Sequence, residues 1–229
     1  MQITHVEVTP TKLDLRVPYR AATHPDEVEQ IDVVFVRIET REGRVAWGCA
    51  AFDPALTGET LDQVLQACRA CAERVKDLNP LNTEFALAEL APLTESMPSV
   101  RCAFDIAFYD LLGLAAGLPL HRLLGGYRYR IQTSITISLR PVKETVEMAR
   151  NRARQGFRII KLKGGIDGVE AGEEIYRQLR IPIVYLTAFS DKATLRRINQ
   201  NKNGKPSTVI YKPFDEGELR VAINSTLDH

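Results

Sequence analysis

Alternating apolar and polar positions predict a small antiparallel sheet near the start of the chain. Three runs rich in β-branched residues carry this pattern, at 2–9, 31–39 and 45–50. The last two flank a short glycine-containing turn, which is typical of a β-hairpin, and the first run can pair beside them. The stretch 18–26 carries two prolines and is predicted to be a loop.

Apolar residues at helical spacing follow the sheet pattern. They predict three helices, at about 59–77, 81–91 and 98–117, the last of which ends at Gly117 ahead of a Leu-Pro pair. Sheet and helices together make residues 1–125 an α+β domain.

From residue 126 onward, strand patterns alternate with helix patterns. Strands are predicted at 132–139, 158–162, 183–186 and 209–211, and helices at 142–155, 168–179, 192–199 and 216–226. Four such β-α units imply a parallel sheet with right-handed crossovers, and residues 126–229 form the second predicted domain. Half of a (β/α)8 barrel and a flavodoxin-like sheet both have this arrangement, and the pattern alone does not separate them.

Composition excludes two classes of partner. The 30 basic and 29 acidic residues leave a net charge of +1, so no field attracts nucleic acid or a membrane surface. No apolar run approaches the ~20 residues that a membrane span needs. The chain opens without an apolar segment of the secretory kind, so we expect a cytoplasmic protein with reduced thiols. Cys68 and Cys71 form a Cys-x-x-Cys motif inside a helical pattern, and we interpret them as small helix residues rather than metal ligands.

Residues 103–126 resemble the helix and exit turn that close the capping domain of the enolase superfamily. The strands at 132–137 and 156–163 resemble the first two barrel strands of its isomerase branch that includes muconate cycloisomerase and the dipeptide epimerases. A Trp-Gly turn at Trp47 and the loop that carries Tyr19 and His24 fit the same capping domain. The resemblance implies that Tyr19 and His24 belong to the binding site.

The same resemblance implies a catalytic role for Lys161 and Lys163. They match the Lys-x-Lys pair at the end of the second barrel strand, where Lys163 would be the base that removes the proton next to a substrate carboxylate. Strand alternation directs both side chains to one face, and two neighbouring ammonium groups lower the pKa of one of them. In the family, Mg²⁺ holds the resulting enediolate.

The family's metal ligands have no counterpart in this sequence. They are acidic residues at the ends of the third, fourth and fifth barrel strands, whereas the third strand here ends in Tyr-Leu-Thr-Ala and the fourth in Ile-Tyr-Lys-Pro, with no fifth. Cys49 also departs from the family, which usually has glutamate after Trp-Gly. We therefore expect no metal site and no bound cofactor, although Mg²⁺ is the cofactor of both families that the chain resembles.

Residues 161–229 carry a second resemblance, to the later part of a response-regulator receiver domain. The segments 181–191 and 211–219 resemble its fourth and fifth strands with the residues that follow them. This implies that Thr187 is the switch hydroxyl and Lys212 the lysine that pairs with a phosphoryl group. The phosphoacceptor aspartate would fall at Ile159, so we expect no phosphorylation, and the Lys212-Pro213 bond is expected to be cis.

Three functions remain open from the sequence. The first is a composite of an enolase-type part (about 1–163) and a receiver-type part without native catalysis. The second is a Mg²⁺-dependent isomerase, either a dipeptide epimerase or a muconate cycloisomerase, and the third is a receiver-like signalling module. A homodimer is predicted as well, because helices would leave one sheet face uncovered, and that face is expected to bear apolar residues such as Ile135, Ile137 and Ile160 or their neighbours.

Overall fold

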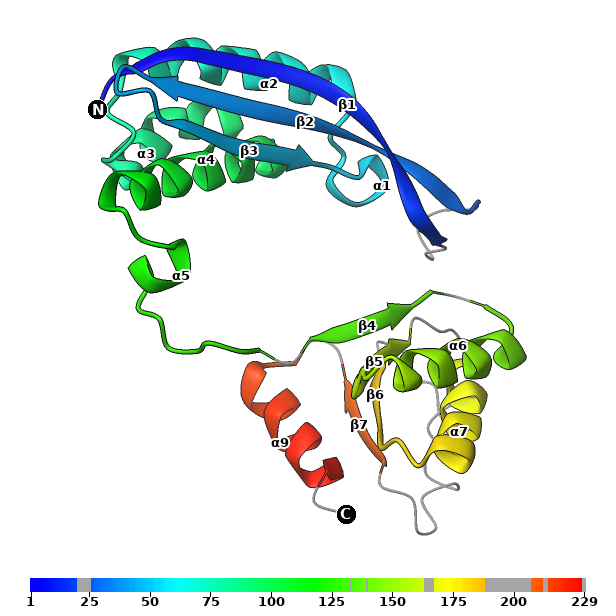
Figure 1. The fold of residues 1–229 in the computed structure, drawn as a ribbon. Coiled ribbons are helices and arrows are strands. Elements are labelled where there is room, and N and C mark those ends of the chain that lie inside the picture. The colour runs from blue at the N-terminus through cyan, green and yellow to red at the C-terminus, as the bar shows by residue number, and fades with distance from the viewer. Residues whose placement is uncertain are drawn as a thin grey trace. The chain divides into compact units, whose positions relative to one another are not determined.

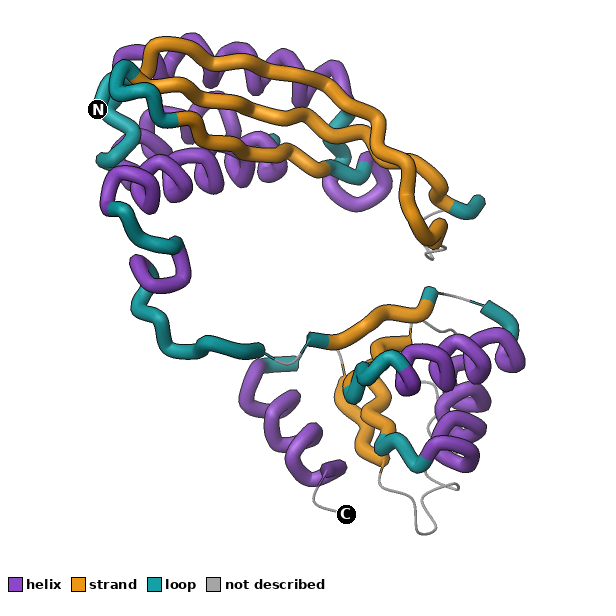
Figure 2. Tube along the Cα trace, viewed as in Figure 1, coloured by secondary structure: helices purple, strands orange, loops and turns teal. Residues whose placement is uncertain are grey.

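The computed structural model describes residues 1–19, 26–131, 133–138, 140–162, 167–187, 207–211 and 214–227 of the chain. The chain folds as two compact units that meet in sequence between Arg130 and Ile131. Figures 1 and 2 show their elements. Among the described residues, no helix combines the length and the apolar character that crossing a membrane requires.

The first unit contains a three-stranded sheet. Its strands are β1 (Ile3–Tyr19), β2 (Val28–Thr40) and β3 (Val45–Ala51), in that order across the sheet. β2 and β3 pair antiparallel on either side of a turn at Gly43, whose φ of +76° is a conformation that glycine adopts readily. The predicted hairpin is therefore confirmed.

β1 extends beyond the predicted run at 2–9, as far as Tyr19. Gln30 of β2 donates a side-chain hydrogen bond to Asp14 Oδ1 at 2.6 Å, so β2 still holds β1 well past the predicted end. β1 lies at the edge of the sheet, where a strand tolerates proline because one of its sides needs no hydrogen-bond donors. The predicted loop therefore begins later than expected, and 20–25 lie outside the described residues.

The three predicted helices are confirmed. They are α2 (Leu61–Arg74) with the 3-10 turn η1 (Val75–Asp77), α3 (Thr83–Thr94) and α4 (Pro98–Ala116). α2 begins with a capping box, in which the side chains of Thr60 and Gln63 each accept a hydrogen bond from the other's backbone N–H. Two single-turn helices, α1 (Pro54–Thr57) and α5 (Leu120–Leu123), were not predicted, because one turn is too short to show a period.

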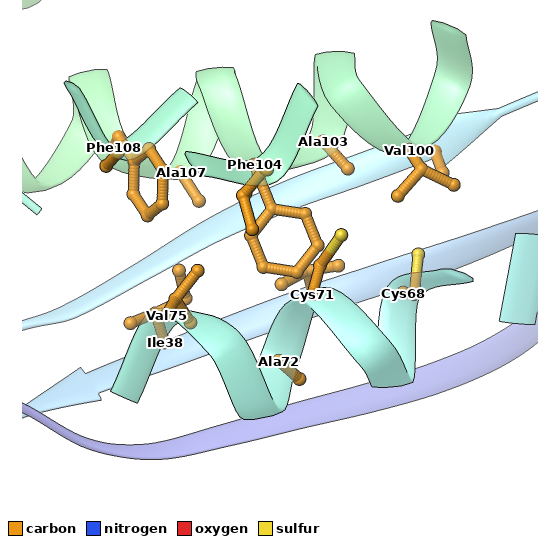
Figure 3. Close-up of a cluster of buried hydrophobic side chains, with 14 of the residues drawn as sticks. Ile38, Cys68, Cys71, Ala72, Val75, Val100, Ala103, Phe104, Ala107 and Phe108 are labelled. Carbon is orange, nitrogen blue, oxygen red and sulfur yellow. The ribbon is translucent and has the colours of Figure 1, made fainter. Parts of the chain in front are cut away.

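The core of the first unit lies between its sheet and α2 and α4. Val36 and Ile38 project from the helix-facing side of β2 and are fully buried. Phe104 of α4 points toward Cys71 of α2 (Figure 3). Cys68 and Cys71 are both buried free thiols in this core, in keeping with their interpretation as helix residues.

Alkaline pH should destabilise the first unit, because it favours ionisation of two buried thiols. Burial raises the pKa of Cys68 and of Cys71 from 9.0 to about 12. Because the pKa is higher in the folded state, the stabilising contribution is complete below about pH 9 and is lost as the pH rises toward 12. Urea unfolding followed at increasing pH should show the loss. A Cys68→Ala/Cys71→Ala variant should lose stability less steeply, and an unchanged slope would contradict this assignment.

The second unit alternates strands and helices as predicted. Its described elements are β4 (Ser134–Ile137), α6 (Val142–Arg154), β5 (Ile159–Leu162), α7 (Asp167–Leu179), β6 (Ile183–Thr187), β7 (Ser207–Tyr211) and α9 (Glu216–Leu227). The helix predicted at 192–199 lies outside the described residues.

The strands of the second unit form two parallel pairs. β4 pairs with β5 and β6 with β7, and within the described residues these are separate two-stranded sheets. The predicted single sheet of four strands is not seen in that part of the chain, so neither a half-barrel nor a flavodoxin-like sheet is complete there. Ile160, Leu162 and Ile183 nevertheless pack on one apolar cluster with α6 and α7. Side-chain packing thus joins the two pairs where backbone pairing does not.

The face of the β4–β5 pair that bears Ile137 and Ile160 is covered by helices. Ile137, Ile160 and Leu162 pack into the cluster under α6 and α7, and Ile135 shares their side of the strands. The opposite face of β4 and β5 carries Ser134, Thr136, Ile159 and Lys161, which are mostly polar. The apolar surface invoked for a homodimer is therefore absent from this strand pair, and the homodimer itself stays a prediction.

Candidate active site

Lys161 lies on the polar face of the β4–β5 pair. It stands directly opposite Thr136 in the parallel register, and its side chain is exposed. Ile160 and Leu162 on either side of it turn toward α6 and α7, so the alternation of the strand directs Lys161 away from those helices. The carboxyl ends of parallel strands are where α/β proteins place their ligand sites. Lys163 lies outside the described residues, so the arrangement of the two lysine side chains on one face stays a prediction.

The other predicted site residues are only partly described. Tyr19 is the last residue of β1 and is half-buried, whereas His24 lies outside the described residues. Thr187 ends β6 and pairs with Tyr211, the last residue of β7. Thr187 and Tyr211 therefore lie at the same end of the β6–β7 pair, and Lys212 follows Tyr211 in sequence. Lys212 itself, and the bond to the following proline, lie outside the described residues.

The described residues do not form a metal centre. Among them, no group of three or more His, Cys, Asp or Glu side chains is arranged to hold a metal ion. Tyr185, in the middle of β6, donates from its hydroxyl to the Val169 carbonyl at 3.4 Å. Burial raises the pKa of Tyr185 to about 12, so this side chain stays neutral. The described part of the chain therefore does not fit Mg²⁺, which prefers a set of oxygen ligands rich in carboxylate.

The Trp-Gly turn has a packing role. A Cβ atom on Gly48 would lie 1.8 Å from the carbonyl oxygen of Ala103, so β3 can pack this closely on α4 only with glycine there. Trp47 points to the other face of the sheet. There its ring packs edge-on against the ring of Phe35, with 6.4 Å between the ring centres. The backbone N–H of Trp47 donates to Asp110 Oδ2 at 3.4 Å, which covers part of the exposed edge of β3.

A buried carboxylate at the start of α4 was not predicted from the sequence. Glu59 is 1% exposed, and its Oε1 accepts hydrogen bonds from the backbone N–H and the hydroxyl of Ser99, at 3.0 and 2.6 Å. The residue before the helix, Met97, has no side chain that can cap it. Glu59 therefore caps α4 from a distant part of the chain, by accepting from one of the first N–H groups of the helix, which have no partner within it. The uncapped Met97-Pro98 start was the signal in the sequence, but it did not indicate the partner.

Comparison with known proteins identifies the first unit. Residues 3–125 match the family described as mandelate racemase / muconate lactonizing enzyme, N-terminal domain, which is more than half of the chain. The chain belongs to this family. It is a member of the enolase superfamily, on the dipeptide-epimerase branch, as the sequence resemblance indicated.

Individual relatives extend the similarity beyond the capping domain. The hydrophobic dipeptide epimerase of Enterococcus faecalis is 34% identical over 171 residues, which are 75% of this chain and 48% of the relative. The L-Ala-D/L-Glu epimerase of Bacillus subtilis is 27% identical over 221 residues, which are 95% of this chain and 58% of the relative.

A solved structure is similar along the whole chain. The dipeptide epimerase of Enterococcus faecalis, in complex with Mg and the dipeptide L-Leu-L-Tyr, has a TM-score of 0.82 and 27% identity and covers 100% of this chain, which spans 65% of that structure. The chain spans about half the length of the curated relatives that it matches. The similarity reaches into residues 161–229, and these proteins lend no support to a receiver domain there.

Proposed function

We propose that this chain takes part in epimerisation at the carbon next to a carboxylate, in a dipeptide substrate. The observation that carries the proposal is Lys161, which lies exposed on the polar face of a parallel strand pair. The similarity of the chain to proteins named dipeptide epimerases supports a dipeptide as the substrate. The β4–β5 pair would present the lysines to the substrate.

The chemistry assigned to the two lysines differs. Lys163 would take the proton from the carbon next to the carboxylate, and the cation of Lys161 would favour the negative charge that then spreads onto the carboxylate oxygens. Inversion is complete when a proton returns from the opposite side, from an acid that the described residues do not identify. Mg²⁺, if bound, would supply positive charge next to the substrate carboxylate, and the residues that would hold it are not among the described ones.

Solvent exchange at the substrate carbon tests this proposal. The protein is incubated in D2O with Mg²⁺ and a panel of hydrophobic and cationic dipeptides, and the loss of the α-proton signal is followed by NMR. We expect exchange with at least one dipeptide, and a rate about 100-fold lower for Lys161→Ala, the loss typical of removing a group that stabilises developing negative charge.

The matched control is Lys143→Ala. Lys143 is an exposed lysine of α6 in the same unit, away from the β4–β5 face, so its removal should leave the exchange rate unchanged. No exchange by the unmodified protein with any dipeptide would overturn the proposal. Equal losses in the two lysine variants would overturn the role of Lys161.

A second candidate is a protein without native catalysis that combines enolase-type and receiver-type parts. The lack of a metal-binding group among the described residues favours it. In the receiver-type part, Thr187 would be the switch hydroxyl, and its pairing with Tyr211 puts it at the carboxyl end of the β6–β7 pair. Ile159 takes the phosphoacceptor position, so treatment with acetyl phosphate and Mg²⁺ should leave the mass of the protein unchanged. A phosphoryl adduct that is labile at alkaline pH would instead favour a signalling module.

A further inference from the structure

Two cysteines of the first unit, Cys49 and Cys102, lie beside the close contact between β3 and α4. Cys49 follows Gly48 on β3, and Cys102 precedes Ala103 on α4. A Cβ atom on Gly48 would lie 3.2 Å from the Cα atom of Ala103. The two backbones therefore approach as closely as those of residues joined by a disulfide, whose Cα atoms are about 4.4–6.8 Å apart. Both thiols are free in this structure, with Cys49 half-buried and Cys102 exposed.

Both cysteines lie where α4 runs along the edge of β3. β3 is an edge strand, and its Trp47 backbone N–H donates to Asp110 Oδ2 of α4 at 3.4 Å. Cys102 lies eight residues before Asp110, a spacing that puts the two on the same side of the helix. The alternation of the strand puts Cys49 on the face that carries Trp47, away from the core side of Gly48. Figure 1 shows α4 running alongside β3. The two thiols therefore border one strand edge, outside the apolar core.

The two thiols also interact electrostatically. Partial burial raises the pKa of Cys49 above its ordinary value, and the negative charge of a Cys102 thiolate raises this pKa further. Such an interaction weakens with distance, so it supports a short separation between the two groups. Cys68 and Cys71 differ, because they are buried in the core and burial raises the pKa of each to about 12. They stay in the thiol form, which does not attack disulfides.

We propose that Cys49 and Cys102 form a reversible disulfide that fastens β3 to α4 when a small disulfide oxidant, such as oxidised glutathione, is present. The thiolate of the exposed Cys102 attacks one sulfur of the oxidant, which gives a mixed disulfide and releases one glutathione thiolate. The thiolate of Cys49 then attacks the Cys102 sulfur, and the second glutathione thiolate leaves. Each cysteine has lost one proton and one electron, and the oxidant has been reduced to two thiols.

The disulfide would close a loop that runs from β3 through α2 and α3 into α4. A cross-link of this kind stabilises a fold mainly by restricting the unfolded chain. It would also fix the contact between Gly48 and Ala103, on which the packing of β3 against α4 depends. In a reducing compartment such a disulfide forms transiently, as in proteins that sense oxidants.

Mass spectrometry of the whole chain, treated with oxidised glutathione at mildly alkaline pH and low protein concentration, tests the proposal. We expect a mass lower by two hydrogen atoms, one cross-linked peptide pair that contains Cys49 and Cys102, and reversal by dithiothreitol. The Cys49→Ser variant should instead keep one glutathione on Cys102, because the second attack cannot occur. Cys68→Ala/Cys71→Ala is the matched control, and it should still form the cross-link.

Four free thiols in the treated protein would overturn the proposal. So would a cross-link through Cys68 or Cys71, a cross-link between two chains, or separate glutathione adducts on Cys49 and Cys102. Urea unfolding supplies an independent readout, since the equilibrium constant for unfolding should fall about tenfold or more on oxidation. The same treatment should leave this constant unchanged in Cys49→Ser. An unchanged constant in the oxidised unmodified protein would contradict a link that fastens β3 to α4.

Discussion

Replacing Gly48 with alanine should destabilise the first unit by about 3 kcal/mol or more, the upper part of the range for overpacked sites. The added methyl group would lie 1.8 Å from the Ala103 carbonyl oxygen, far inside van der Waals contact. Both groups in this contact belong to backbone, one in β3 and one in α4, so no flexible side chain can turn aside. The strand would have to move away from the helix, and the core between the sheet and the helices would open.

Urea unfolding of the Gly48→Ala variant measures this effect. Ala51→Val is the matched control, since it also enlarges a side chain on β3 but at an exposed position. It should change the free energy of unfolding by less than about 0.5 kcal/mol. If both variants unfolded at the same urea concentration as the unmodified protein, that result would contradict the close contact between β3 and α4.

Phe104→Ala should cost the first unit about 3–5 kcal/mol, the usual loss for a phenylalanine removed from a core. Phe104 is fully buried, lies 6.2 Å from Phe108 between ring centres, and points toward Cys71 of α2 (Figure 3). Its loss would remove apolar contacts within α4 and with α2. It would also leave a cavity in the core of the first unit.

The control for this substitution is Phe85→Ala. Phe85 lies on α3 with 58% of its surface exposed, so the same change there should alter the free energy of unfolding by no more than about 0.5 kcal/mol. Thermal or urea unfolding of the two variants provides the comparison. A loss of less than about 1 kcal/mol for Phe104→Ala would mean that this side chain is not at the centre of the core.

The sequence could predict most of the elements because they are local. Alternation and the turn at Gly43 indicate the β2–β3 hairpin, and helical spacing indicates α2, α3 and α4. Each signal lies within one element or between two neighbours in sequence. The family could also be predicted, since the residues that resemble it follow one another in order over a long stretch.

The candidate site was predicted less completely. The resemblance pointed to Lys161, and strand alternation then placed it on the face away from α6 and α7. The sequence did not indicate which face of the β4–β5 pair the helices cover; in the structure it is the face that bears Ile137 and Ile160. Both faces of this short pair contain isoleucine, so the pattern of apolar residues does not distinguish them.

The sequence by itself therefore determined the order and type of most of the described elements and the family. Only the tertiary structure decided which faces are covered, that Gly48 contacts Ala103, and that Glu59 caps α4. The physical reason is that periodicity records which residues of an element share a side, whereas contacts between distant residues depend on how whole elements pack. Glu59 and Ser99 are 40 positions apart, and no local pattern links them.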